Sequence, residues 1–270
     1  MEPGNYSRVW GILCWVGALA VSLATGLVAG FGRSVPIEYQ ISPPGISLHE
    51  PAFIVFSVRN ELAERVDLDL GFNRTQNFAL AIIEPSGALV TPPRPGPHEG
   101  INRSGRVELA PGETYRQTIL INEFYQFETP GTYRISVRMV GSISDRSGAL
   151  RESPPSQELS LTVAPADHEK LRRVCQQLVD SATSSNAAEA LDAARALGYI
   201  EDLTAVPYLE RLTKQGAFLV VIRPRAIDGL ARIANREGIE QVVSRLELPS
   251  PELESSIRAA QSALRRPPGR

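Results

Sequence analysis

The spacing of apolar residues along this chain changes once, from a strand-like to a helix-like period, and this change limits the folds that the chain can adopt. From residue 36 to residue 163, apolar and polar residues alternate in short runs separated by Pro, Gly and Asn, which is typical of β-strands. From Asp167 onward, the apolar residues recur at helical spacing. Between the two patterns lies Val163-Ala164-Pro165-Ala166, where the proline removes a backbone donor and discourages a continuing strand. The sequence therefore predicts a multidomain chain, β then α.

The alternating pattern predicts an antiparallel β-sandwich at residues 36–163. About seven short strands separated by turns fit two packed antiparallel sheets. The turn residues agree, since Pro111-Gly112 and Pro130-Gly131 each precede an expected strand and supply a preset φ and a flexible glycine. The expected strands are Ile37–Ile41, Ala52–Val58, Val66–Leu70, Asn77–Ile83, Thr114–Ile121, Tyr133–Val140 and Glu158–Val163.

One corner of the predicted sandwich resembles a known family. Pro130-Gly131-Thr132-Tyr133, with apolar Ile135 and Val137 following in alternation, resembles the start of the penultimate strand of immunoglobulin-like domains, where a tyrosine pins the corner. The Cys…Trp…Cys core of antibody domains is missing, because both tryptophans, Trp10 and Trp15, lie near the N-terminus. The resemblance therefore implies the broader immunoglobulin-like sandwich, a fold of many extracytoplasmic modules.

The helical pattern at residues 167–266 repeats along the chain. Ala193, Ala226 and Ala259 recur at an interval of 33 residues, and neighbouring apolar positions keep this register. The run Ala193–Ile200, followed by Ala205–Leu209, resembles a HEAT repeat, in which one helix ends at a glycine and the next begins around a proline. The resemblance implies a short α-helical repeat array, in which each unit covers the apolar face of its neighbour.

Several residues mark where these helices should begin. Asn186-Ala187-Ala188-Glu189 has the spacing of a capping box. Ser250-Pro251-Glu252 places a cap, a first-turn proline and an acid in order. The pair Glu201-Asp202 is interpreted as negative charge at a helix start.

An uncharged apolar segment precedes the β domain and indicates export. Val9–Phe31 contains no charged residue, and Arg8 and Arg33 bracket it, as in an export signal. The run exceeds the ~7–15 apolar residues of a cleaved signal and reaches the ~20 residues of a membrane-spanning helix. Residues 1–35 are therefore interpreted as an N-terminal apolar helix, either a cleaved signal peptide or a retained membrane anchor. Both outcomes place the chain outside the cytoplasm, as a periplasmic, secreted or membrane-anchored protein.

Charge and cysteine content exclude several classes of protein. The formal net charge is −2, from 28 basic and 30 acidic residues, so no basic footprint for nucleic acid stands out. Cys14 and Cys175 are the two cysteines, too few for a zinc site built mainly from cysteine. Cys175 falls on an apolar helix face and is expected in the core.

Residues that could carry chemistry are few. The histidines His49, His98 and His168 lie in no recognisable catalytic motif and are interpreted as surface residues. Asp67 and Asp69 alternate with leucines, which is typical of the solvated face of a strand rather than of a metal site. No glycine-rich phosphate loop occurs. The sequence therefore predicts no catalytic residue, no cofactor and no metal.

Two segments that combine amides with aromatics, Asn73–Phe78 and Asn122–Phe127, are the candidate binding rim. Asn73, Arg74, Phe124 and Tyr125 are its candidate residues, because aromatic rings supply apolar area and amides supply hydrogen bonds. The alternative is that the aromatic side chains close one end of the sandwich.

The function expected is an extracytoplasmic protein-interaction or scaffold protein without catalytic activity. It would bind an unidentified protein partner, and the membrane as well if the N-terminal segment is retained. The alternatives are an envelope hydrolase or protease-inhibitor-like protein, and a membrane-tethered structural spacer. A pocket that joins a histidine, a carboxylate and a Ser or Thr would favour the hydrolase.

Overall fold

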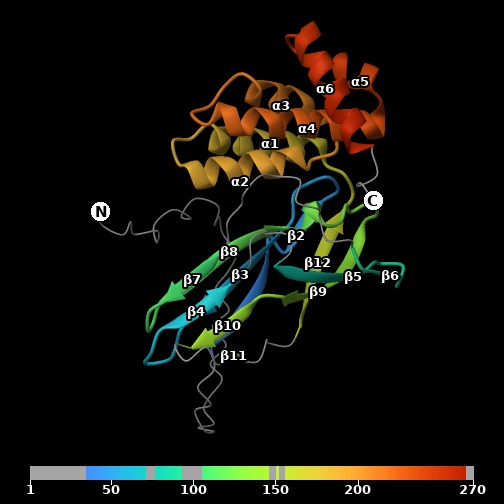
Figure 1. The fold of residues 1–270 in the computed structure, drawn as a ribbon. Coiled ribbons are helices and arrows are strands. Elements are labelled where there is room, and N and C mark those ends of the chain that lie inside the picture. Colours follow the sequence, from blue (N-terminus) through green and yellow to red (C-terminus); the bar gives the residue numbers. More distant parts are fainter. Residues whose placement is uncertain (1–34, 71–76, 93–104, 146–149, 152–155, 266–270) are drawn as a thin grey trace. The chain divides into compact units, whose positions relative to one another are not determined.

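The chain folds into β-sheets followed by a group of helices, as the change of period predicts (Figure 1). The computed structural model describes residues 35–70, 77–92, 105–145, 150–151 and 156–265. The strands are β1 Ile37–Ser42, β2 Gly45–Ser47, β3 Phe53–Arg59, β4 Val66–Asp69, β5 Phe78–Ile83, β6 Leu89–Val90, β7 Arg106–Leu109, β8 Thr114–Leu120, β9 Gly131–Met139, β10 Ser142–Asp145, β11 Leu150–Arg151 and β12 Gln157–Ala164.

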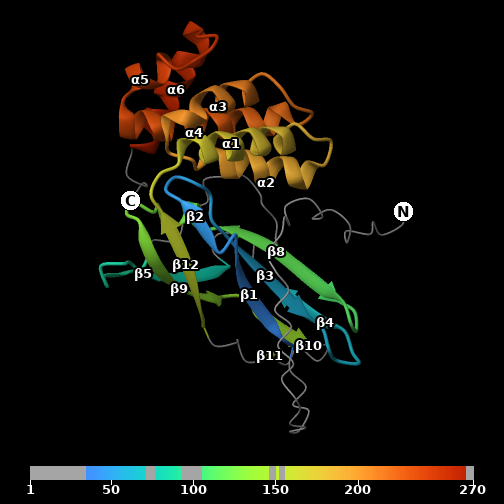
Figure 2. The ribbon, with the colours of Figure 1, turned by 180° about the vertical axis from the view of Figure 1, so that it is seen from behind.

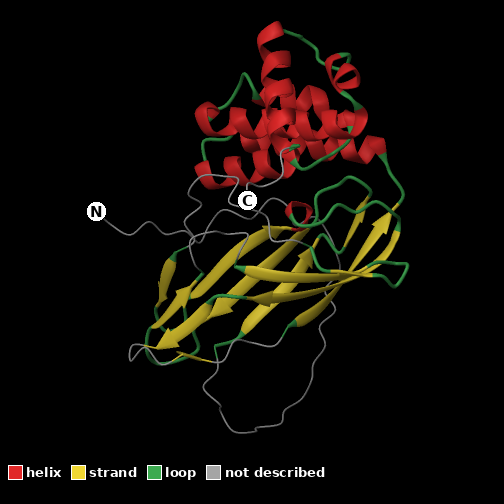
Figure 3. Ribbon diagram, turned by 45° about the vertical axis from the view of Figure 1, so that its right-hand side comes forward, coloured by secondary structure: helices red, strands yellow, loops and turns green. Residues whose placement is uncertain are grey.

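Three residues separate the last strand from the first helix. The helices are α1 His168–Ala182, α2 Ala187–Gly198, α3 Val206–Leu212, α4 Leu219–Glu237, α5 Ile239–Val243 and α6 Pro251–Leu264, with short 3-10 turns η2 Ile121–Glu123 and η3 Leu203–Ala205. Figure 3 shows the helices as one group and the strands as another.

Among the described residues, the strands form three sheets around one hydrophobic core, where the alternating pattern predicted two. The part of the chain that contains them, β1 to β12, is called the sandwich below. Their orders are β1-β3-β8, β11-β10-β4-β7 and β2-β12-β9-β5-β6. Every pairing is antiparallel except that of β2 with β12. Strands β1, β3 and β8 run side by side in Figure 2. Phe56 of β3 packs edge-on against Phe78 of β5, with ring centroids 5.0 Å apart, so the first and third sheets share their core.

The predicted tyrosine corner is present in the sheet that contains β9. Tyr133 is fully buried, and its hydroxyl donates to the carbonyl oxygen of Thr129 at 2.8 Å. A tyrosine that bonds to the backbone a few residues upstream is typical of immunoglobulin-like sandwiches. The first residue of β9, Gly131, has a φ of 144°, which few side chains tolerate.

All seven expected strands are found, with ends that differ by one or two residues. The short strands β2, β6, β7, β10 and β11 were not predicted. They have two to four residues each, too few for an alternating pattern to show.

The helices enclose a second hydrophobic core. The apolar pairs related by the 33-residue shift are buried in it: Leu197 and Leu230, Ile200 and Ile233, and Leu209 and Val242. Of the three repeated alanines, Ala193 and Ala226 are buried and Ala259 is exposed. Helices α2 and α4 cross closely, because a Cβ added at Gly229 would lie 2.9 Å from the Cα of Gly198.

The predicted helix starts are confirmed. Asn186 Oδ1 accepts hydrogen bonds from the backbone N–H groups of Ala188 and Glu189 at the start of α2. Ser250 caps α6 through its bond from the backbone N–H of Leu253. These caps satisfy amides that the helices leave without partners.

The predicted N-terminal apolar helix and most of the 1–35 segment lie outside the described residues. Residues 1–33 and 34–270 are two separate units. Among the described residues, no helix combines the length and the apolar character needed to cross a membrane.

Candidate functional site

Two ion pairs connect the sandwich to the first helices. Glu123 at the end of η2 places Oε1 2.9 Å from Nε of Arg195 in α2, and both side chains are only 5% exposed. Lys170 in α1 places Nζ 2.8 Å from Oε2 of Glu50, whose carboxylate is buried. A buried charge is costly unless it is paired, so these contacts favour one arrangement of the strands and helices.

Gln126 is the third link between sandwich and helices. Its Nε2 lies within hydrogen-bond distance of the carbonyl oxygen of Tyr199, at 3.3 Å, and of Oε1 of Glu201, at 3.4 Å. The neighbouring Asn122 accepts a bond from the backbone N–H of Ala52 at 2.8 Å through Oδ1. The polar residues of this segment, which the sequence singled out, therefore lie at the junction of the two parts.

The predicted binding rim is only partly visible. Asn73 and Arg74 lie outside the described residues. Phe124 and Tyr125 are partly buried and pack against the sandwich core. The hydroxyl of Tyr125 donates to Oε1 of Glu84 at 2.5 Å, and burial together with this bond raises the pKa of Tyr125. Both rings therefore contribute to closing the sandwich, and a binding role for them stays a prediction.

An open cavity of about 360 Å³ lies beside the junction. Its walls come from the chain before η3, from α4 and from the end of α6: Glu201, Arg232, Asn235, Arg236 and Leu264. Burial raises the pKa of Glu201, although the charges of the two arginines partly oppose this effect. The cavity thus combines two guanidinium groups, one amide, one carboxylate and one apolar side chain.

The two arginines of the cavity differ in how firmly they are held. Arg232 donates from Nη1 to the carbonyl oxygen of Gly198 at 3.0 Å, and its guanidinium carbon lies 4.0 Å from the centre of the Tyr199 ring. Such cation–π contacts fix a guanidinium in place. In the part of the chain that the structure describes, Arg236 forms one ion pair, in which its Nε lies 3.4 Å from Oε1 of the adjacent Glu237.

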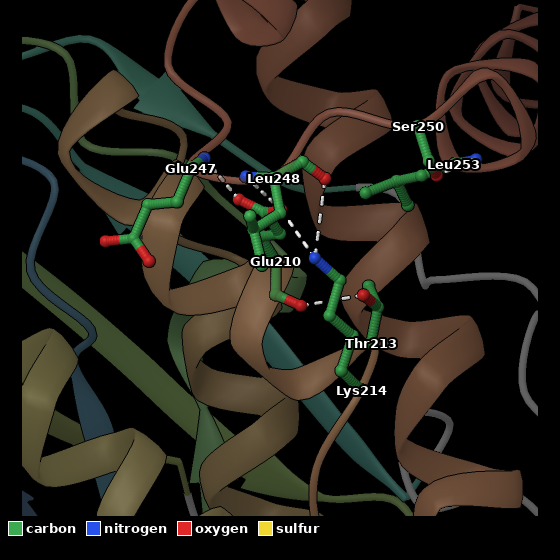
Figure 4. Close-up of polar contacts among 7 residues, drawn as sticks. All are labelled: Glu210, Thr213, Lys214, Glu247, Leu248, Ser250 and Leu253. Carbon is green, nitrogen blue, oxygen red and sulfur yellow. Dashed lines mark hydrogen bonds and ion pairs between the residues drawn. The ribbon is translucent and has the colours of Figure 1, made fainter.

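A second polar cluster fixes the position of α6, which supplies one wall of the cavity (Figure 4). Glu210 in α3 is buried, and its carboxylate accepts bonds from the backbone N–H groups of Glu247 and Leu248 at 2.6 and 3.0 Å. Lys214 donates to the same carboxylate at 2.7 Å. This carboxylate therefore holds the chain between α5 and α6 against α3.

The histidine nearest to a hydrolase-like arrangement lacks its geometry. Nδ1 of His168 lies 3.8 Å from Oδ1 of Asp202 and 3.5 Å from Oγ1 of Thr204. In a catalytic triad, the carboxylate and the nucleophile bind different nitrogens of the histidine ring. One nitrogen then accepts the proton of the nucleophile, while the carboxylate orients the ring through the other. Here both groups approach the same nitrogen, and Asp202 Oδ1 instead caps η3 through the backbone N–H of Thr204.

Burial and neighbouring charges shift the pKa values of His49 and Asp202. His49 has a φ of 74°, and burial lowers its pKa, while the charge of Asp202 opposes this effect. Burial pushes the pKa of Asp202 upward, but bonds from Thr204 and the two nearby histidines outweigh it and lower the pKa. His98 lies outside the described residues. The prediction that Asp202 supplies charge at a helix start is confirmed.

Other candidates from the sequence are placed as expected. Asp67 and Asp69 alternate with buried Leu68 along β4, and Asp69 lies 3.7 Å from Arg106 on the neighbouring strand. Cys175 is fully buried, and burial raises the pKa of its thiol to about 12. Among the described residues, no cluster of three or more His, Cys, Asp or Glu could hold a metal ion.

Sequence reasoning missed the cavity. Its residues come from three elements that are distant along the chain, and only the fold brings them together. One signal was available, because Arg232, Asn235 and Arg236 have the i, i+3, i+4 spacing that places side chains on one helix face.

Comparison with known proteins gives no family. No family model matches the chain, and no curated protein matches it. Solved structures that are similar to about half of it include a CARDB domain from Pyrococcus furiosus, described in complex with di-metal ions (14% identity, 50% of this chain and 97% of that one, TM-score 0.27), a beta-glucosidase from Listeria innocua (15%, 48% and 16%, 0.26) and the sporulation control protein Spo0M from Bacillus subtilis (11%, 53% and 54%, 0.27). These TM-scores are too low to support an argument about function.

Proposed function

We propose that this protein is a non-catalytic, extracytoplasmic interaction protein. Its immunoglobulin-like sandwich and its HEAT-like helices would form adjacent binding surfaces for a protein partner. In both folds, exposed strands, loops or helices serve as binding surfaces. We apply this to the present chain by analogy with the fold. The strand order, the Tyr133 corner and the buried 33-residue register support these finer fold assignments.

The observation that carries the proposal is the buried junction. The Glu123–Arg195 pair and the contacts of Gln126 connect the sandwich to α2 and to the chain before η3. A partner could therefore contact both parts without first ordering a flexible linker, which would lower the entropic cost of binding.

The hydrolase alternative has less support. The contact of His168 with Asp202 and Thr204 is the arrangement that comes nearest to it, and both contacts use Nδ1. This geometry gives no route from a hydroxyl nucleophile through the ring to a carboxylate.

Mild crosslinking in the native organism, followed by capture of the tagged full chain, tests the interaction function. We expect one or a few specific protein partners, and their recovery should fall when the junction is broken by Arg195→Met. An Arg173→Gln variant is the control, because Arg173 is exposed on α1 and pairs only with Glu169 of the same helix among the described residues. Recovery of no partner would contradict the proposal.

N-terminal sequencing of the mature protein tests the export part. A new N-terminus within residues 24–35 would show cleavage of the leader and exclude the membrane-tethered spacer. An intact N-terminus in the membrane fraction would support the anchor. A full-length protein in the cytoplasm would contradict the extracytoplasmic assignment.

A further inference from the structure

We propose that the cavity lined by Glu201, Arg232, Asn235, Arg236 and Leu264 binds a segment of the partner protein that presents one acidic side chain next to an aliphatic one. This inference rests on the proposed interaction function and specifies the chemistry of the partner. It is argued from the charge, hydrogen-bonding capacity and shape of the cavity walls.

The arginines are the part of the cavity that selects an acidic group. A guanidinium has five N–H donors, and in the described part of the chain Arg232 uses Nη1 for its bond to Gly198. Arg236 and Glu237 are adjacent in sequence, and their side chains are 37% and 39% exposed. Their ion pair is therefore weak, and the carboxylate of a ligand could replace Glu237 as the partner of Arg236. A carboxylate entering the cavity would therefore find donors on both arginines. Arginine forks bind carboxylates in two-bond geometry, which is stronger than a neutral hydrogen bond.

The position of Arg232 favours binding, because this side chain is ordered before any ligand arrives. The Tyr199 ring beneath it and the Gly198 carbonyl restrict its rotation. A flexible arginine would lose side-chain entropy on binding, and the contacts of Arg232 restrict its motion before the ligand arrives.

Glu201 excludes ligands with several negative charges. Its carboxylate lies among the walls of the same cavity, within the electrostatic range of both arginines, and forms no ion pair among the described residues. Together with the two arginines it leaves the cavity one net positive charge, which matches one acidic group better than the several charges of a phosphate or a nucleic acid. A peptide carries one acidic side chain together with backbone N–H groups, and these can donate to the Glu201 carboxylate. A peptide segment therefore matches the mixed charge of the cavity better than a polyanion does.

The remaining walls suit a neighbouring aliphatic side chain. Leu264 at the end of α6 is 41% exposed, which is high for a large apolar residue in this molecule. Asn235 lies between the two arginines in sequence, and its Oδ1 accepts a bond from Nε of Arg265 at 2.7 Å. Asn235 thus holds a third basic side chain, that of Arg265, at the edge of the cavity.

The test is selection of a phage-displayed library of random peptides on the immobilised full chain. The displayed peptides are fused at their C-terminus, so any carboxylate that is selected belongs to a side chain. We expect enriched peptides to share an Asp or Glu beside Leu, Ile or Val. Their binding should fall about tenfold on Arg236→Gln, which corresponds to one charge-assisted hydrogen bond. Arg173→Gln should leave binding unchanged, since it removes an exposed arginine of α1 that does not line the cavity.

Two further variants keep the test decisive. Arg236→Lys retains the charge and loses the fork, so it should bind with intermediate strength. Asn235→Ala should weaken binding by removing the partner of Arg265. Thermal unfolding of each variant shows that it is folded, which is expected because Asn235 and Arg236 are exposed.

Three results would overturn the proposal: no enrichment of acidic peptides, equal binding to wild type and Arg236→Gln, or retained binding of a synthetic peptide in which the acid is replaced by its amide. The proposed function fails separately. If native crosslinking recovers the same partner with Arg236→Gln as with wild type, the cavity is not the binding site and the interaction function stands.

Discussion

The Tyr133 hydroxyl shows how a single buried polar atom fixes a corner of the sandwich. The side chain is fully buried, and its oxygen has two partners on Thr129, the carbonyl oxygen at 2.8 Å and Oγ1 at 3.0 Å. A buried polar group is stable only when its hydrogen bonds are made. The bond therefore ties β9 to the loop that precedes it.

We expect Tyr133→Phe to lower the free energy of unfolding by about 1–3 kcal/mol, because it leaves the Thr129 carbonyl without this donor. Urea denaturation followed by circular dichroism measures the change. Tyr208→Phe is the control, since Tyr208 packs partly buried against the helical core and its hydroxyl has no hydrogen bond among the described residues. Equal effects of the two changes would mean that ring packing, and not the corner bond, supplies the stability.

Glu210 is a buried charged group that also depends on its hydrogen bonds, and its contribution to the stability of the fold depends on pH. Burial pushes the pKa of Glu210 upward, but bonds from Lys214 and from two backbone N–H groups outweigh burial, so the pKa lies below its usual value. A carboxylate with a lowered folded pKa stabilises the fold above its unfolded pKa of about 4.3, and this stabilisation is lost as pH falls through the folded pKa.

We expect Glu210→Gln to be less stable than wild type by about 1–3 kcal/mol at neutral pH, because the amide has no charge and only one acceptor oxygen, so it cannot accept from both Glu247 and Leu248 as the carboxylate does. The difference should shrink as pH falls below about 4. Chemical unfolding of both proteins across this pH range measures it. A difference that stays constant with pH would mean that the charge of Glu210 contributes nothing.

Among the elements, the crossing of α2 and α4 depends on two small residues. A Cβ at Gly229 would lie 2.9 Å from Cα and 3.1 Å from O of Gly198, and 3.1 Å from a methyl group of Leu209. These atoms belong to backbone and core, which cannot move without cost. The helices therefore approach each other closely at this point because neither glycine has a side chain.

We expect Gly229→Ala to destabilise the protein by about 1–3 kcal/mol through overpacking. The sign of the effect is informative, because alanine by itself favours a helix over glycine by about 1 kcal/mol. Thermal unfolding followed at 222 nm measures the change. A gain in stability would show that the crossing can widen to admit a methyl group.

In the whole molecule, the Glu123–Arg195 pair couples the sandwich to the helices. Both side chains are 5% exposed, so the pair is shielded from water and from salt. Removing one partner of a buried ion pair leaves the other charge buried without a partner, which destabilises the fold. Replacing both partners with apolar residues often leaves the stability unchanged. The junction can therefore be tested by changing one residue and then both.

We expect Arg195→Met to destabilise the protein by about 3–5 kcal/mol and Glu123→Leu/Arg195→Met to recover most of that loss. Hydrogen exchange followed by mass spectrometry should show the single variant opening first at η2 and α2. If the single and double variants are equally unstable, the coupling comes from packing and not from the ion pair.

The sequence by itself determined the two kinds of secondary structure and many of their ends. The period of two predicted seven strands, and Asn186 and Ser250 marked helix starts, because alternation and capping are set by neighbouring residues. It also predicted the Tyr133 corner, whose bond spans only four residues.

The tertiary structure alone decided the junction and the cavity. Glu123 and Arg195 are 72 positions apart, and no local rule connects them. The arginines of α4 have helical spacing, but only the packing of α6 and the chain before η3 places Leu264 and Glu201 beside them. Short strands such as β2 form for the same reason, because they depend on pairing with a distant strand and not on their own pattern.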